Sequence, residues 1–246
     1  DAQGFGRWKA DIEGLFLPGY GLRARAADEP PSVGASRLGG WPDLPPGLAW
    51  PTSDQGAPLS LLAQFRLSDL QASPLPATGM LYFFYDAANQ PWHSGDAPGA
   101  WRVVFHPSEE GLEEARPSAN DVPPNFTALS VFAEAFVSPD LQWSSWASEW
   151  RASYSEVQLI QELQKSVQEV EPDFKHQLLG CASLIQDAHP NEGQPPTDPY
   201  RLLFQIGSDR RTEMLWGDSG CLYFWVRQSA LNRHDFSQIL GILQCY

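Results

Sequence analysis

Two short, strongly apolar stretches dominate the pattern of hydrophobic and polar positions along this chain. They cover residues 80–85 and 220–226, and each is bounded by turn-forming residues. Continuous apolar runs of this length are typical of strands that are buried on both faces. The same criteria predict further strands at residues 59–67, 101–106, 127–136, 178–185, 200–206 and 242–246. Short strands with such connections favour a mainly antiparallel sheet.

The strand pattern occurs twice. A single shift (220 − 79 = 141) lays residues 220–225 on residues 79–84 without a gap, and it also lays Gln205 on Gln64 and Leu179 on Leu38. One offset across three separated blocks indicates an internal duplication. We therefore predict a single domain over residues 1–246. Its parts are an N-terminal helix and loop (1–35), a first repeat (36–106), a helical insertion (107–175) and a second repeat (176–246).

Apolar positions at steps of three and four residues predict a few flanking helices. One such pattern covers residues 3–17, which Pro18-Gly19 would end, and residues 23–31 then have the composition of a loop. Another covers residues 140–170, and its tryptophan face suits either the core or a partner surface. Asp235, with a glutamine three residues later, predicts a short helix near the end of the chain. The expected fold class is α+β, a predominantly antiparallel β-sheet built from an internal duplication with a few flanking helices.

Residues 38–51 form a proline- and glycine-rich segment that carries Trp41 and Trp50. Proline at this density is incompatible with a helix and favours turns. We expect an extended, turn-rich path that holds the two tryptophans in place.

The charge of the chain restricts its partners. Asp and Glu number 30 against 16 for Lys and Arg, so the formal net charge is −14, and no basic cluster occurs. Long-range repulsion therefore argues against nucleic acid and anionic membranes as partners. No apolar run approaches the roughly 20 residues of a membrane-spanning helix. An acidic surface suits a basic protein partner, although solubility is the simpler explanation.

Cysteine use indicates a reducing compartment. Cys181, Cys221 and Cys245 lie far apart, are odd in number and form no metal-ligand pair. The start of the chain shows no charged stretch followed by an apolar one, as a signal peptide would. The expected localisation is cytoplasmic.

Six blocks of the sequence resemble the YwqG-like family of bacterial proteins. The matching blocks are residues 38–45, 58–64, 79–86, 203–205 with Asp209, 216–225 and 243–246. The resemblance implies a single α+β, sheet-rich fold with an internal repeat, and it implies no established reaction. Some relatives are encoded near secreted toxins, so the resemblance also implies a toxin-neutralising role.

Gly217-Asp218-Ser219-Gly220 looks like the nucleophile segment of trypsin-like proteases. A nucleophilic serine requires a histidine base and an orienting carboxylate, and no histidine of this chain lies in a matching context. The duplication places Ser219 on Thr78, which indicates that the turn requires a small hydroxyl residue. No metal-binding spacing of histidine or cysteine occurs either. We therefore expect no catalytic residues, no metal, no cofactor and no enzymatic activity.

The repeat makes Gln64 and Gln205 equivalent. A buried amide left without partners costs about 1–3 kcal/mol, so each side chain should be hydrogen-bonded. The two glutamines would pair across a pseudo-twofold axis or bond to backbone beside the Trp-Pro segments. Alternatively, they form the polar floor of a cleft between the repeats, with tryptophan walls and Asp218 at the rim. The candidate ligand- or partner-binding residues are Trp41, Asp43, Trp50, Gln64, Gln205, Asp209, Trp216 and Asp218.

Two hypotheses follow. The first is a non-enzymatic, acidic cytosolic binding protein, in its most concrete form an immunity-type factor that neutralises a basic toxin by protein–protein binding. The alternative is a small-ligand-binding or weakly enzymatic protein that uses the cleft between the repeats.

Overall fold

A ten-stranded antiparallel sheet forms the body of the protein. The structure is a computed structural model that describes residues 16–24, 31–70, 73–117, 122–139, 174–186, 189–192 and 197–246. The strands of the large sheet are β1 (Phe16–Ala24), β2 (Arg37–Leu38), β4 (Ser60–Arg66), β5 (Met80–Tyr85), β6 (Trp101–His106), β8 (Leu129–Pro139), β9 (His176–Leu179), β10 (Tyr200–Gly207), β11 (Cys221–Arg227) and β12 (Leu240–Gln244). A second, two-stranded sheet pairs β3 (Asp43–Leu44) with β7 (Glu113–Glu114).

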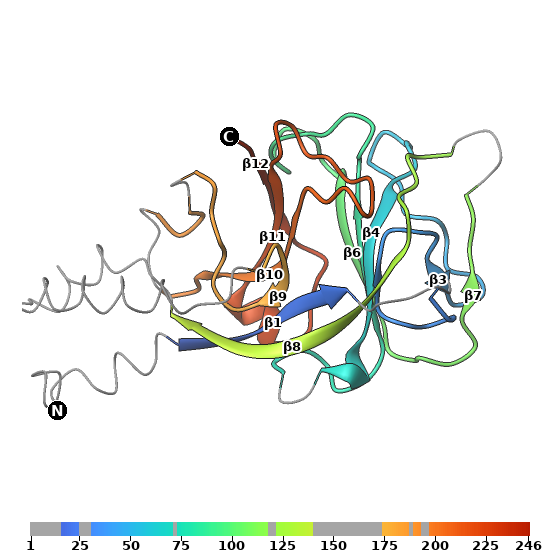
Figure 1. Cartoon of the computed structure of the whole chain (residues 1–246), viewed down its shortest axis with the longest axis horizontal. Coiled ribbons are helices and arrows are strands. Elements are labelled where there is room, and N and C mark those ends of the chain that lie inside the picture. Colours follow the sequence, from blue (N-terminus) through green and yellow to red (C-terminus); the bar gives the residue numbers. More distant parts are fainter. Residues whose placement is uncertain are drawn as a thin grey trace, which may run out of the picture.

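The long strands β1 and β8 form the centre of the large sheet. They pair along the whole of β1, from Phe16 opposite Pro139 to Ala24 opposite Val131. The strand order is β12-β11-β10-β9-β1-β8-β2-β4-β5-β6, so a four-strand group lies on either side of this central pair. In Figure 1, β1 and β8 cross the front of the molecule between the orange-to-red group and the cyan-to-green group. We call the two groups the second half and the first half.

The two outer edges of the sheet meet, and the sheet nearly closes into a barrel. The segment before β6 pairs with β12, because the Leu243 N–H donates to the Trp92 carbonyl at 2.8 Å and the Ser94 N–H to the Gly241 carbonyl at 2.9 Å. The Trp101 ring from β6 lies so close to Gly241 that a Cβ there would overlap it. A side chain, in place of a strand ladder, therefore fills part of this seam.

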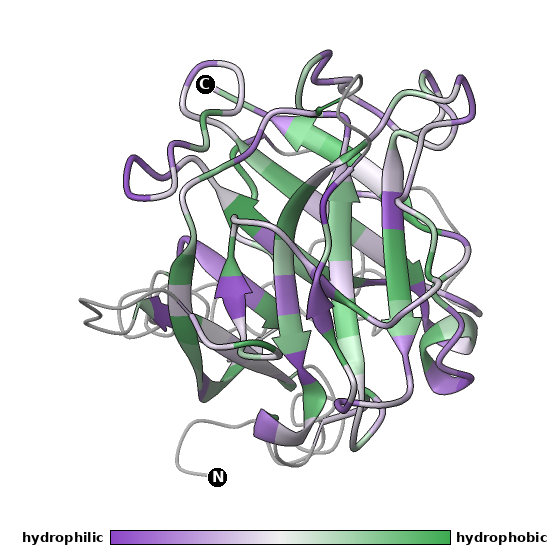
Figure 2. Ribbon diagram, turned by 90° about the vertical axis from the view of Figure 1, so that its right-hand side faces the viewer, coloured by the Kyte–Doolittle hydropathy of each residue, from purple (hydrophilic) through white to green (hydrophobic). Residues whose placement is uncertain are grey.

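Buried residues cover both faces of β5 and β11, as their unbroken apolar sequences predict. The inward side chains join one cluster inside the barrel, which includes Phe83 and Phe224 in ring contact at 5.2 Å. The outward side chains lie in two smaller clusters, one beneath Trp50 and one beneath Leu184 and Ile185. Figure 2 shows most of the apolar positions on the strands and most of the polar ones in the loops.

The antiparallel sheet is confirmed, but the described residues are nearly all β. They contain one short α-helix, α4 (Gln228–Asn232), and one 3-10 turn, η2 (Leu67–Asp69). The helix expected at 235–238 is wrong, because the Asp235 carboxylate instead accepts the N–H and the hydroxyl of Ser237 and so closes a turn. Residues 1–15 and 140–173, with most of the other expected helices, lie outside the described residues.

The expected helix end at Pro18-Gly19 is also wrong, since both residues lie within strand β1. Glycine is needed in β1 because aromatic rings cover its outer face. A Cβ at Gly19 would stand 2.8 Å from the Phe136 ring, and one at Gly21 would overlap the Phe174 ring. The glycines that resemble a helix stop in sequence thus make room for partners far along the chain.

Several other boundaries differ from the expected ones. Strand β9 ends at Leu179, short of the expected 178–185, because Leu179 and Gly180 have φ angles of 57° and 69° and turn the chain out of the sheet. The closing strand is 240–244, where 242–246 was expected. Within the segment 107–175, named a helical insertion, the strand expected at 127–136 is present as β8, and β7 is a further strand.

Candidate functional site

Gln205 on β10 and Tyr223 on β11 are cross-strand neighbours, and both contact Ser183 in the loop after β9. The Gln205 Oε1 accepts the Ser183 N–H at 3.0 Å, and the Tyr223 hydroxyl donates to the Ser183 carbonyl at 2.7 Å. The Gln205 Nε2 donates to the Phe174 carbonyl at 3.1 Å, on the chain leading into β9. This glutamine–tyrosine clamp holds the chain on both sides of β9.

The first half contains the same clamp. Gln64 and Tyr82 are cross-strand neighbours on β4 and β5. The Gln64 Oε1 accepts the Asp43 N–H at 2.8 Å, the Tyr82 hydroxyl donates to the Asp43 carbonyl at 2.5 Å, and the Gln64 Nε2 donates to the Ala35 carbonyl at 3.0 Å. The Asp43 carboxylate also accepts from the Gln64 Nε2 at 2.8 Å and from Arg37 Nη1 at 2.7 Å, and both Asp43 and Arg37 are buried.

The two glutamines do not pair with each other. Each one bonds within its own half, so the expected contact across a pseudo-twofold axis is wrong. The alternative expectation, a hydrogen bond to backbone beside a Trp-Pro segment, is confirmed for Gln64, because its partner Asp43 follows Trp41-Pro42 directly. In both side chains the amide oxygen and the amide nitrogen are hydrogen-bonded within the fold.

The structure does not bring the expected tryptophans into one cleft. Trp41 and Trp50 meet edge to face with ring centroids 6.0 Å apart, over the outer face of β5. Trp216 is fully buried in the barrel core against Tyr85. Asp218 is exposed at the tip of the turn before β11.

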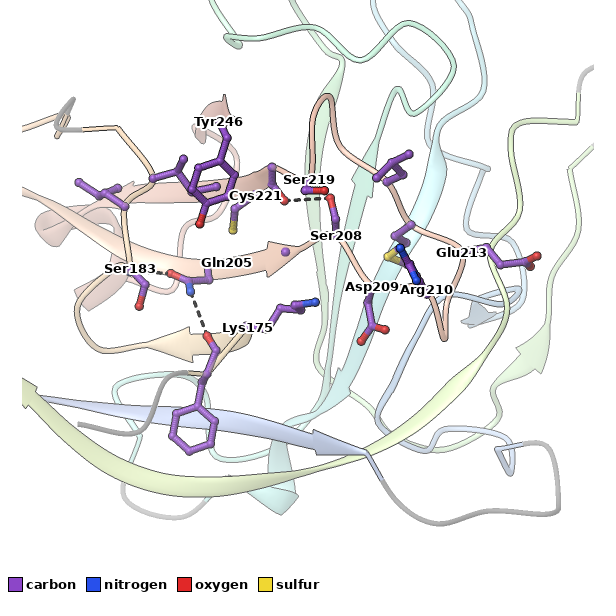
Figure 3. Close-up of a pocket in the computed structure, with 17 residues that line it drawn as sticks. Lys175, Ser183, Gln205, Ser208, Asp209, Arg210, Glu213, Ser219, Cys221 and Tyr246 are labelled. Carbon is purple, nitrogen blue, oxygen red and sulfur yellow. Dashed lines mark hydrogen bonds between the residues drawn. The ribbon is translucent and has the colours of Figure 1, made fainter. Parts of the chain in front are cut away.

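A pocket of about 920 Å³ lies where β10 ends and β11 begins. We call it the β10–β11 pocket. It is lined by Phe174, Lys175, Ser183, Leu184, Ile185, Gln205, Gly207, Ser208, Asp209, Arg210, Glu213, Met214, Leu215, Ser219, Gly220, Cys221 and Tyr246 (Figure 3). Of the eight residues predicted from sequence, Gln205 and Asp209 line this pocket.

Asp209 is part of a buried polar group beside the pocket. Its Oδ2 lies 3.0 Å from His176 Nε2, and Arg211 contacts both carboxylate oxygens at 2.6–3.1 Å. Hydrogen bonding to His176, together with the Arg211 contacts, holds the pKa of Asp209 far below its ordinary range. Burial lowers the pKa of His176, and this outweighs the opposing effect of Asp209. The neutral imidazole therefore donates from Nε2 to an ionised carboxylate.

Two cations line the pocket without an acidic partner among the described residues. Lys175 and Arg210 form no ion pair there. The Lys175 side chain crosses Gly207, where an added Cβ would stand 2.7 Å from the Lys175 Cγ. In Figure 3 it extends toward the side of the pocket where Asp209 and Arg210 lie. Sequence reasoning missed Lys175, because a lone lysine before a short strand carries no motif.

The thiol of Cys221 is not activated in this pocket. Burial raises the pKa of Cys221 to about 12, so its thiol stays protonated at neutral pH. Ser219 has a φ of 55° in the turn whose Gly220 N–H bonds to the Trp216 carbonyl at 2.6 Å. The geometry accords with the turn role expected for Ser219. In the parts of the chain that the structure describes, no group of three or more His, Cys, Asp or Glu residues is placed to hold a metal ion.

A smaller hollow of about 470 Å³ lies along the barrel seam and takes residues from both halves. Trp101, Arg102, Tyr200 and Arg227 are among the residues that line it. The Arg102 Nη2 donates to the Asp54 carboxylate at 2.7 Å, and Arg227 donates to the Asp198 carbonyl at 2.8 Å. The arginines of the seam are thus already partnered, which distinguishes it from the β10–β11 pocket.

Comparison with known protein families identifies the family of this chain. No curated protein matches it. Among the described residues, no helix is long and apolar enough to cross a membrane. Residues 36–245 match the family described as a domain of unknown function, DUF1963, and the chain therefore belongs to that family.

Proposed function

We propose that this protein is a non-enzymatic binding protein that holds a small ligand in the β10–β11 pocket. The observation that carries the proposal is the combination of a ligand-sized hollow with two cationic side chains, Lys175 and Arg210, that have no acidic partner among the described residues. Ligand pockets in proteins commonly measure about 300–1,000 Å³ and combine apolar walls with a few polar groups. The β10–β11 pocket lies within that range.

The pocket has both kinds of lining. Leu184, Ile185 and Leu215 supply apolar surface, and Tyr246 extends it at the rim. Leu215 and Tyr246 are 59% and 85% exposed, so both offer apolar surface to a bound ligand. The clamp holds the Ser183 backbone in place, so this part of the wall is preorganised.

An internal duplication is part of the same proposal, and the strand registers support it. Each half has one bulge at the same place, between Leu61 and Ala63 in β4 and between Leu202 and Phe204 in β10. The shift of 141 relates both bulges and both glutamine–tyrosine clamps. Under this proposal the two halves share one framework and differ in what covers their strand ends.

Other expectations from the sequence stay predictions. The basic toxin partner has the net charge of −14 in its favour. The narrower YwqG-like name, the cytoplasmic location and the role in immunity rest on the sequence resemblance and composition described above.

A substitution that fills the pocket tests the proposed function. Ser183 is exposed, and its hydroxyl makes no hydrogen bond among the described residues, so Ser183→Trp adds bulk without removing a bond. Ser32, an exposed serine in the first half, provides the matched control Ser32→Trp. A metabolite library is screened by thermal shift against the wild type and both variants.

Ligands that stabilise the wild type and Ser32→Trp, but not Ser183→Trp, support the proposal. Ligands that stabilise all three proteins equally would place binding elsewhere. A library without any stabilising compound would contradict small-ligand binding and favour the protein-partner hypothesis.

A further inference from the structure

We infer that the β10–β11 pocket binds the carboxylate group of a small, partly apolar ligand through Lys175. The inference rests on the proposed function and adds the chemical class of the ligand. Its basis is a comparison between two corresponding places in the structure, one of which already holds a carboxylate.

In the first half a glutamate occupies this place. The Glu109 carboxylate accepts the Ser68 N–H at 3.0 Å, the Ser68 hydroxyl at 2.7 Å and the Gly79 N–H at 3.0 Å. Arg66 Nη1 lies 3.5 Å from the same carboxylate. The strand ends of β4 and β5 are thereby covered by an acid that is paired with a long cation.

The second half has the same framework, with the cation moved. Arg66 faces Met80 in the β4–β5 register as Gly207 faces Cys221 in the β10–β11 register. Arg66 crosses Gly34, where an added Cβ would stand 2.5 Å from Nη2, whereas Lys175 crosses Gly207. The shift of 141 relates Gly34 to Lys175 and Arg66 to Gly207. In the first half the cation, Arg66, ends a strand and the glycine lies earlier in the chain, whereas in the second half the glycine, Gly207, ends the strand and the cation lies earlier. In both halves the cationic side chain crosses the glycine.

Among the described residues, no acid covers the strand ends of the second half as Glu109 covers those of the first. Asp209 stands where the first half has Ser68, but its carboxylate faces His176 and is neutralised by Arg211. The Glu213 Oε2 accepts a hydrogen bond from the Thr127 hydroxyl at 2.6 Å, and in Figure 3 the Glu213 side chain points away from Lys175. Lys175 is thus left without a counter-charge among the described residues, with Arg210 as a second unpaired cation in the pocket.

The backbone groups differ between the halves. In the second half, the N–H groups of Asp209 and Gly220 bond within their own loop, to Met214 and Trp216. A ligand carboxylate therefore binds mainly through the Lys175 ammonium. The rest of the ligand lies against the apolar wall formed by Leu184 and Ile185.

A matched pair of probes isolates the charge. Hexanoate and hexanamide have nearly the same size and the same apolar tail, but hexanoate alone carries a negative charge at neutral pH. Binding of each to the full chain is measured by NMR titration, with the Ser183 and Gln205 amide signals as reporters. Inorganic phosphate serves as a third probe, which separates a carboxylate site from a general anion site.

Three variants accompany the wild type. Lys175→Met keeps the aliphatic contact with Gly207 and removes the charge, and Lys175→Arg restores the charge. Arg233→Met is the control, because Arg233 is exposed, makes no ion pair among the described residues and lies outside the pocket. A charge-assisted contact in a partly open site should make hexanoate bind about threefold to tenfold more tightly than hexanamide. Lys175→Met should abolish this preference, whereas Lys175→Arg and Arg233→Met should keep it.

Equal affinity for hexanoate and hexanamide, or a preference that survives Lys175→Met, would overturn the inference. Phosphate binding more tightly than hexanoate would also overturn it, in favour of a phosphate site. Failure of the carboxylate inference can be distinguished from failure of the proposed small-ligand function. A neutral library ligand that Ser183→Trp excludes and Lys175→Met leaves unaffected would keep the pocket and remove the carboxylate.

Discussion

Gln205 and Tyr223 act on the two backbone groups of a single residue, Ser183. The glutamine accepts the Ser183 N–H at 3.0 Å, and the tyrosine donates to its carbonyl at 2.7 Å. Because the two side chains are neighbours across β10 and β11, they fix this part of the pocket wall to the sheet. The pocket thus depends on a side-chain clamp, and its shape is as stable as the strands that carry the clamp.

Gln205→Ala should lower the free energy of unfolding by about 2–4 kcal/mol, because it leaves the buried Phe174 carbonyl and the half-buried Ser183 N–H without partners. The control is Gln90→Ala. The Gln90 amide also makes two hydrogen bonds, to Leu215 and Gly217, but both are solvent-exposed. Loss of the Gln90 amide should lower the free energy of unfolding by less than about 1 kcal/mol, because water replaces its hydrogen-bond partners. Urea unfolding monitored by tryptophan fluorescence gives both values, and equal losses would contradict a buried clamp.

Asp43→Asn should be strongly destabilising, because it leaves the Arg37 guanidinium buried without its counter-charge. The two side chains are 2% and 5% exposed, and breaking such a pair costs about 3–5 kcal/mol. Asp54→Asn breaks a pair of the same 2.7 Å length with Arg102 on the surface and should cost less than about 1 kcal/mol. The comparison is made by denaturant unfolding at one pH, and similar costs for both variants would contradict the burial argument.

Gly241→Ala should destabilise the barrel seam, because the new methyl group would overlap the Trp101 ring. We expect a loss of about 1–3 kcal/mol in the wild type, as for other overpacked cores. In a Trp101→Ala background the same change should cost little, since the ring is gone. A double-mutant cycle by thermal or chemical unfolding measures this coupling. Additive effects would mean that Trp101 does not occupy the seam.

Lowering the pH below about 6.5 should reduce the stability contributed by His176. Burial keeps the folded pKa of His176 below its ordinary value of 6.5, so between the two pKa values the unfolded chain binds more protons than the folded one. The contribution is complete above the unfolded pKa and is lost as the pH falls toward the folded pKa. Asp209 stays ionised in this window, because its own pKa is lowered by the His176 contact and by Arg211.

His176→Gln removes this titration and keeps a donor for Asp209. The wild type should therefore lose more unfolding free energy than His176→Gln between about pH 7.5 and pH 5.5. Urea unfolding at both pH values measures the difference. Parallel losses in the two proteins would show that His176 titrates as an ordinary histidine.

The candidate site was only partly predictable. Gln205 was chosen because an amide within an apolar strand must find partners, and that argument is local. Trp216 was assigned to a cleft wall, but it lies in the core because the turn before β11 folds inward against Tyr85. Lys175 carries no motif in the sequence, and only the tertiary structure places its side chain in the pocket across Gly207.

The sequence alone determined that strands form at runs such as 80–85 and 220–226 and that the sheet is antiparallel, because such unbroken apolar runs can satisfy their side chains only when both faces are covered. It also predicted that Gln64 and Gln205 would both be hydrogen-bonded, as they are. The tertiary structure decided how the halves join: through β1 and β8, with Gly19 and Gly21 under aromatic rings, and through Trp101 in the seam. Glycine in a strand and glycine at a helix end look alike in sequence. The two kinds of glycine are distinguished only by the side chain that packs over the strand glycine, and that side chain comes from a residue far away in the chain.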